Sequence, residues 1–165
     1  MKKLFLICLL GICITTSLSA QNLPQYDNIK LEAKEDYKRA DSVVLQASNY
    51  LLTTPIDKTN IGRLKSMQFL IKWMTGTPDY SFSLDENTVK YFVNDADLMG
   101  TYMAALSKSA LQNKPGTDNK TLTLSAVKIL LVYMNNTNNN VTVTDPLKKL
   151  SEANDNGQLV SFLKL

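Results

Sequence analysis

The sequence contains no histidine, and its only two cysteines, Cys8 and Cys13, lie close to the N-terminus. Without an imidazole, the chain can form neither a Ser-His-Asp triad nor a histidine general base. Two cysteines are too few for a disulfide framework, and most zinc and copper sites use histidine or cysteine ligands. We therefore expect no cofactor and no metal site, and any chemistry would rest on Asp, Glu, Lys, Tyr, Ser and Thr.

Residues 1–20 have the three-part layout of a secretory signal peptide. Lys2 and Lys3 form a basic start, residues 4–14 form an apolar run, and small and hydroxyl residues follow up to Ala20. As a helix this run would cover roughly 16 Å, about half of the bilayer core. We expect cleavage after Ala20, which removes both cysteines; cleavage after Ser19 and a retained membrane anchor are the alternatives. The mature domain is then residues 21–165, with no membrane span.

Glycine is scarce and basic charge is not in large excess. None of the six glycines forms a GxGxxG or Walker phosphate-binding motif. The whole chain has 18 basic and 15 acidic residues, and the two leader lysines reduce this to 16 and 15 in residues 21–165. A net charge of +1 gives no electrostatic basis for binding nucleic acid or an anionic membrane, so we expect no nucleic-acid partner.

Apolar residues recur at helical spacing along most of the mature chain. The segments predicted as helices are 31–53, 58–74, 85–93, 95–112, 120–135 and a last helix from Asp145 to Gly157. We expect Asp145 to cap that last helix, with Pro146 at its first position. A buried strand is the alternative for the apolar run 127–134, although no second strand is available to pair with it. The fold class predicted is all-α, a compact bundle of five to six helices in one domain.

The spacing also predicts which faces of these helices are buried. The run 129–134 is apolar throughout, which predicts that 120–135 is the central helix. Gly100 and Ala104 are small residues four apart, which would let another helix approach closely. For segment 58–74, the predicted inner stripe is Ile61, Leu64, Met67, Ile71 and Met74, widened by Phe69, Leu70 and Trp73.

A shift of 60 residues places segment 58–74 on segment 120–135, with Leu70 on Leu130 and Trp73 on Tyr133. Two copies of a helical hairpin would give this alignment, and so would any two amphipathic helices slid along each other. Two stacked αα-hairpins in a TPR-like arrangement are therefore one form that the bundle can take. The spacing differs from the roughly 34 residues of the tetratricopeptide repeat itself.

The densest cluster of unusual side chains is residues 73–82, WMTGTPDYSF, which joins the only tryptophan to a Thr-Gly-Thr-Pro turn. Aromatic side chains with a polar tip are common at binding surfaces, and loops on rigid helices often carry function. The candidate binding residues are Trp73, Thr77, Asp79, Tyr80 and Phe82. The alternative is a connection folded back on the helices, with Trp73 and Phe82 in the core and Asp79 stabilising the turn.

Carboxylate pairs occur at 85–86 and at Asp95 and Asp97, where predicted helices begin. Acidic residues favour helix starts because they accept hydrogen bonds from exposed amides and complement the helix dipole. A glycosidase would need two carboxyls about 5–10 Å apart across a sugar-sized cleft. We interpret both pairs as caps, and a small carboxylate-based hydrolase of the periplasm remains the alternative function.

The Lys-Lys leader, the Ala20–Gln21 cleavage point and the Asn- and Lys-rich helices resemble small exported proteins of Bacteroidetes-type bacteria. The resemblance concerns the leader and the composition, and it carries over neither an activity nor any site residue. We expect an exported protein, periplasmic or extracellular, whose non-catalytic helical domain binds a protein, peptide or cell-envelope component. This hypothesis predicts an exposed apolar or aromatic patch, whereas a hydrolase predicts a deep pocket with two perturbed ionisable groups.

Overall fold

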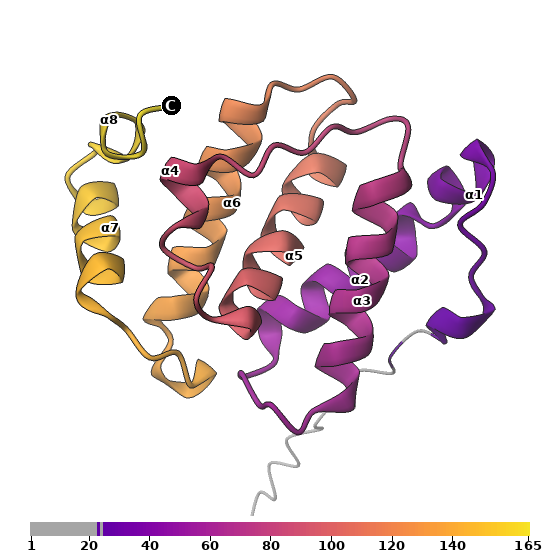
Figure 1. Cartoon of the computed structure of the whole chain (residues 1–165), viewed down its shortest axis with the longest axis horizontal. Helices are drawn as coiled ribbons and strands as arrows, with labels where there is room; N and C mark the ends of the chain where they lie inside the picture. Colours follow the sequence, from indigo (N-terminus) through magenta and orange to yellow (C-terminus); the bar gives the residue numbers. More distant parts are fainter. Residues whose placement is uncertain (1–22, 24) are drawn as a thin grey trace, which may run out of the picture.

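A computed structural model describes residues 23 and 25–165, and this part of the chain contains helices and no strand (Figure 1). The predicted all-α fold is confirmed, and the run 127–134 is helix. The predicted signal peptide and its cleavage point lie outside the described residues. The α-helices are α1 (Lys34–Arg39), α2 (Asp41–Thr53), α3 (Ile61–Gly76), α4 (Glu86–Val89), α5 (Ala96–Gln112), α6 (Asn119–Asn135), α7 (Asp145–Asp155) and α8 (Leu159–Leu163). Two short 3₁₀ turns are η1 (Tyr26–Asn28) and η2 (Thr137–Asn139).

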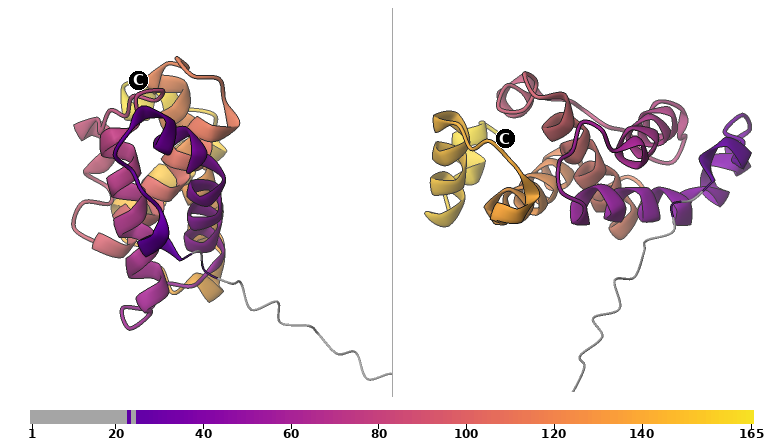
Figure 2. Two further views of the ribbon diagram at one scale, coloured as in Figure 1. Left: turned by 90° about the vertical axis from the view of Figure 1, so that its right-hand side faces the viewer. Right: turned by 90° about the horizontal axis from the view of Figure 1, so that it is seen from below.

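Helix α5 is the centre of the bundle, because it contacts α2, α3 and α6. Figure 1 shows α5 between α6 and α3, with α2 behind them, and Figure 2 shows α1 and the α7–α8 pair at opposite ends. The expectation that 120–135 is central is wrong, because one side of α6 lies in water and Val132 is 75% exposed. The buried residues of α5 include Gly100, Ala104 and Ala105, and such small side chains let helices approach from several sides.

Helices α3 and α5 pack closely at Gly100. A Cβ atom added there would collide with the sulfur of Met67, so a larger residue fits only if the Met67 side chain moves. The expected role of Gly100 in close helix packing is therefore confirmed.

Two helical pairs, α2 with α3 and α5 with α6, stack on each other through α2 and α5. Under the 60-residue shift, Leu70 and Leu130 correspond and both are buried, as are Trp73 and Tyr133. The correspondence is partial, because other aligned positions of α3 and α6 differ in exposure.

Several helix boundaries differ from those predicted. Segment 31–53 consists of two helices that meet at Ala40. The Ala40 amide donates hydrogen bonds to two carbonyls of the preceding turn, which tightens the chain there. Helix α7 has Thr144 as its N-cap instead of Asp145, whose carboxylate pairs with Lys148 at a distance of 3.1 Å. Pro146 is therefore the second residue of α7 instead of the first, although it still lies in the first turn.

Carboxylates cap three other helices. Asp85, Asp95 and Asp118 each accept a hydrogen bond from an amide two or three residues later, at 2.9, 3.0 and 2.9 Å. These bonds satisfy donors that the first turn of a helix otherwise leaves free. The interpretation of the acidic pairs as helix starts is confirmed, although α4 covers only four residues of the segment 85–93.

The core consists of two apolar clusters that meet on α5. One cluster surrounds Trp73 and contains Leu51, Leu70 and Ala104 of α5. The other contains Leu106 of α5 and reaches α6, α7 and α8. Because α5 contributes to both clusters, neither end of the bundle is packed independently of the other.

Candidate functional site

The outward side of α3 is the place where the structure departs most from the predicted packing. Ile61, Leu64 and Ile71, expected in the inner stripe, are 63%, 48% and 47% exposed. Met67 and Met74 are only partly buried. The residues that α3 buries are Gly62, Arg63, Ser66, Phe69, Leu70 and Trp73. The predicted inner stripe is therefore wrong, and three large apolar side chains of α3 face water.

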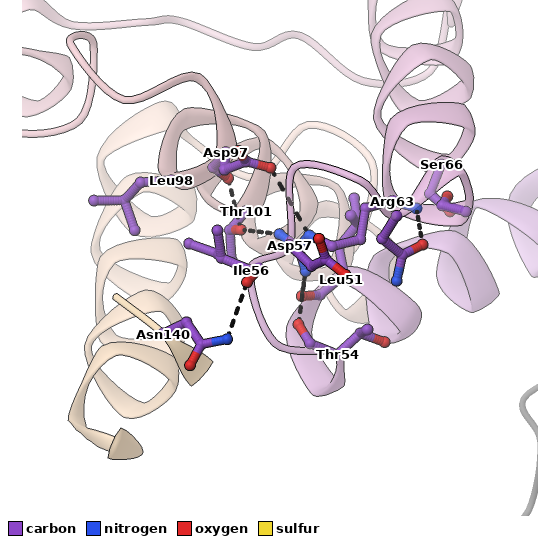
Figure 3. Close-up of polar contacts among 12 residues, drawn as sticks. Leu51, Thr54, Ile56, Asp57, Arg63, Ser66, Asp97, Leu98, Thr101 and Asn140 are labelled. Atoms are coloured by element: carbon purple, nitrogen blue, oxygen red, sulfur yellow. Dashed lines mark hydrogen bonds and ion pairs between the residues drawn. The ribbon is translucent and has the colours of Figure 1, made fainter. Parts of the chain in front are cut away.

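Arg63 explains this rotation of α3, because its side chain is fully buried and finds its partners inside the bundle (Figure 3). Its Nη1 donates to the carbonyl oxygens of Leu51 at 3.1 Å and of Thr54 at 2.6 Å. Its Nη2 donates to Thr101 Oγ1 at 3.0 Å, and Nε lies 3.9 Å from Asp97 Oδ1. A buried cation is destabilising unless such partners surround it. Because Arg63 has these partners only inside the bundle, the side of α3 that carries it points inward.

The connection between α2 and α3 is held at the same place by residues from the end of α6. The Tyr133 hydroxyl donates to the Thr54 carbonyl at 2.8 Å. The Asn140 side-chain amide donates to the Ile56 carbonyl at 3.1 Å, and the Ile56 amide donates to the Asn139 carbonyl at 3.0 Å. Burial raises the pKa of Tyr133, which keeps this hydroxyl a proton donor. Apart from Arg63 Nε, which has no hydrogen bond, the polar groups of Arg63 and of the residues around it bond to one another, and this arrangement has a structural role.

Two lysines run along one edge of the exposed stripe. Lys65 and Lys72 are seven residues apart, two helical turns, and therefore lie on the same side of α3. Lys65 Nζ lies 3.6 Å from Asp27 Oδ2, but both side chains are largely exposed and such pairs contribute little. Lys72 has no ion pair with any described residue, and α3 contains no Asp or Glu. We call the set Ile61, Leu64, Lys65, Gln68, Ile71 and Lys72 the α3 outer face.

A groove of about 390 Å³ lies beside this edge, between α3 and the segment around η1. Its lining consists of Tyr26, Asp27, Ile29, Lys65, Gln68, Phe69 and Lys72. The rings of Tyr26 and Phe69 stack with centroids 4.7 Å apart, and the Tyr26 hydroxyl is hydrogen-bonded to Ser66 at 2.8 Å. The groove therefore has an aromatic floor and a wall that carries both lysines.

The structure brings together the aromatic residues of the predicted 73–82 site, but it places Trp73 in the core. The indole of Trp73 has no exposed surface, and its N–H donates to the Tyr37 carbonyl at 3.3 Å. The rings of Tyr80 and Phe82 lie 5.6 and 5.8 Å from it, so the segment folds back over α3. Thr77 caps the end of α3, where its amide donates to the Trp73 carbonyl at 2.9 Å.

Asp79 and Tyr80 line a surface pocket of about 350 Å³ between their loop and the connection from α5 to α6. Asp79 lies 3.9 Å from Lys34 Nζ, and the pocket's second carboxylate, Asp118, is engaged in capping α6. Burial, followed by the nearby charge of Asp79, raises the pKa of Asp41, and burial raises the pKa of Tyr80. Asp41 is not part of the pocket lining, so this pocket does not combine two carboxyls of raised pKa.

Arg63 and the α3 outer face are the features that sequence reasoning missed. Arg63 is spaced with Ser66, Leu70 and Trp73 on one side of α3, and this apolar side was the only signal of its burial. A lone charge in such a row is ordinarily assigned to the surface.

No group of three or more Asp, Glu, His or Cys side chains suited to a metal ion occurs within the described part of the chain. In residues 23 and 25–165, every helix is too short or too polar to cross a bilayer. Comparison with known protein families, with curated proteins and with solved structures gives no match for this chain. The geometry of the α3 outer face and of the loop pocket is thus the basis for a functional proposal.

Proposed function

We propose that the mature chain is an exported, non-catalytic α-helical domain that binds a protein partner through the α3 outer face. The observation that carries this proposal is the exposure of Ile61, Leu64 and Ile71 on a helix whose other side is fully buried. Apolar side chains gathered on one exposed surface are typical of interaction sites. Their transfer from water into an interface would supply the driving force for binding. The proposed export rests on the leader sequence.

The rigidity of α3 supports the same proposal. The buried guanidinium of Arg63 holds the helix to α2 and α5, and Met67 of α3 packs directly on Gly100 of α5. A surface that is ordered before binding loses less conformational entropy when a partner docks. In many complexes an amphipathic helix binds its partner through apolar side chains spaced over several turns. The α3 outer face presents apolar side chains with such a spacing.

Capture of partners from the native cell envelope tests this proposal, with residues 21–165 immobilised. Leu64→Asp and Ile71→Asp should each abolish capture of the protein that the unchanged domain retains, because a charge replaces an apolar anchor. Val132→Asp on α6 is the matched control, since Val132 is even more exposed and lies outside the α3 outer face. Thermal unfolding followed by circular dichroism should confirm that all three variants stay folded.

Capture of the same protein by both α3 variants would contradict the proposal. Loss of capture in Tyr80→Ala alone would instead place the binding site at the pocket lined by Asp79 and Tyr80.

A further inference from the structure

We infer that the partner docks on the α3 outer face with an amphipathic helix whose edge is acidic. This inference rests on the proposed function and adds the chemistry of the partner. It follows from the charge of α3, which has Lys65 and Lys72 along one edge of its apolar stripe and no acidic residue.

The spacing of the α3 side chains sets the length of the docking helix. Ile61 and Ile71 are ten residues apart, which corresponds to roughly 15 Å along the axis, or about three turns. A helix laid along this stripe meets it with apolar side chains at steps of three and four. Lys65 and Lys72 are separated by two turns, so acidic residues seven apart on the docking helix lie opposite both of them.

The groove beside α3 gives the docking helix a second point of attachment. It has a volume of about 390 Å³, and its floor is the stacked pair Tyr26 and Phe69. A large apolar side chain at the acidic edge of the docking helix would enter it, next to the two lysines. Anchors that enter pockets commonly contribute most of the affinity of an interface.

The same charges disfavour a second copy of this chain. An antiparallel two-fold contact between two α3 helices would place Lys65 and Lys72 of one copy on the same edge as the two lysines of the other, and α3 has no acidic residue to pair with them in either orientation. Like charges that face each other across an interface are unfavourable. The acidic side chain closest to them, Asp27, already lies 3.6 Å from Lys65 and belongs to the same surface.

An anionic membrane is also a poorer match than a peptide. Helices that lie in the membrane interface commonly carry Trp or Phe on the apolar face and many lysines or arginines on the polar face. The α3 outer face has two lysines and no aromatic residue, and residues 21–165 have nearly balanced charge.

Binding of two synthetic peptides, measured by fluorescence anisotropy, tests the inference. The first is a fluorescein-labelled amphipathic helix with leucines and glutamates at the spacings given above, and its twin has lysines in place of the glutamates. We expect the glutamate peptide to bind about tenfold more tightly than its twin, and added salt to weaken this preference.

Charge reversal on α3 provides the matched comparison. The double variant Lys65→Glu/Lys72→Glu should reverse the preference towards the lysine twin, whereas Lys128→Glu on α6, also exposed, should leave it unchanged. Leu64→Asp should weaken the binding of both peptides, because the apolar stripe is common to the two complexes.

Equal binding of both peptides, or binding of neither, would overturn the inference. The proposed function would still stand if Leu64→Asp and Ile71→Asp abolished envelope capture, so the two failures are distinguishable. Binding to phosphatidylglycerol vesicles without binding to the glutamate peptide would assign the face to a membrane. A dimer in analytical ultracentrifugation that Ile71→Asp dissociates would assign it to a second copy.

Discussion

Among single residues, Arg63 joins three helices, because its guanidinium on α3 binds carbonyls at the end of α2 and two side chains of α5. Those carbonyls have no partner within α2, since the last turn of a helix leaves its acceptors free. The same side chain therefore completes the end of one helix and sets the rotation of the next. Through this rotation it also determines that Ile61, Leu64 and Ile71 lie in water.

Replacement of Arg63 by methionine should reduce the free energy of unfolding by about 3 kcal/mol, because it leaves Asp97 and the Leu51 carbonyl without their buried partner. Urea denaturation followed by circular dichroism measures this change. Lys65→Met is the control, because Lys65 is an exposed cation on the same helix and its loss should change stability by less than about 0.5 kcal/mol. An equal stability of both variants would show that the buried guanidinium contributes nothing to the bundle.

Asp41 gives a prediction about pH. Burial and the charge of Asp79 raise its pKa in the folded chain above the ordinary value of 3.8. Its stabilising contribution is complete below that value and is lost as the pH rises through the folded pKa. Asp41→Asn should therefore increase the melting temperature at pH 7, and the difference should vanish as the pH falls below about 3.8.

Asp57 is the opposite control for that experiment. Hydrogen bonds from the Thr59 hydroxyl and amide lower its pKa, so its contribution is present at neutral pH and is lost as the pH falls through the folded value. Asp57→Asn should lower the melting temperature at pH 7 and lose its effect in acid. The same sign for Asp41→Asn and Asp57→Asn would contradict these opposite pKa shifts.

At the scale of helices, the crossing of α3 and α5 depends on Gly100. Gly100→Leu would drive a side chain into Met67, and overpacking of this kind reduces stability by about 1–3 kcal/mol. The additional change Met67→Ala opens space at the same point, so the double variant should regain part of the loss. Chemical denaturation of the three variants measures this coupling, and purely additive effects would exclude direct contact at the crossing.

The positions of helices along the chain could be predicted from the sequence. Which side of each helix is buried, and which helix lies at the centre of the bundle, could not. Apolar spacing and acidic caps locate α5 and α6 to within a few residues, whereas the predicted segment 31–53 is divided between α1 and α2. In α3, however, both Leu64 and Leu70 belong to apolar rows, and the partners that bury Arg63 come from residues up to 38 positions away. The hydropathy of α6 likewise suggested a central helix. The central helix is α5, because its small buried side chains allow other helices to pack on several of its sides. The sequence led us to expect an exposed apolar patch, but not that it would lie on α3, because its location depends on these long-range contacts.

At the scale of the whole molecule, the two apolar clusters share α5 and should unfold together. Trp73, the only tryptophan, lies in one cluster, so its fluorescence reports on that end of the bundle. Far-UV circular dichroism reports on all helices, including α7 and α8 at the other end. We expect coincident urea transitions from the two probes, as a two-state domain gives. Separate midpoints would show that the clusters are independent units.

The contacts of Arg63 also affect how the polypeptide folds during its synthesis. A chain growing from its N-terminus completes α2 and then α3. Thr101, a partner of Arg63, is not added until 38 residues after Arg63. Until α5 has been made, the α2–α3 pair holds a guanidinium with half of its partners and an uncovered apolar side. The pair is thus no free-standing repeat, and nascent chains that end before α5 should remain protease-sensitive until the central helix arrives.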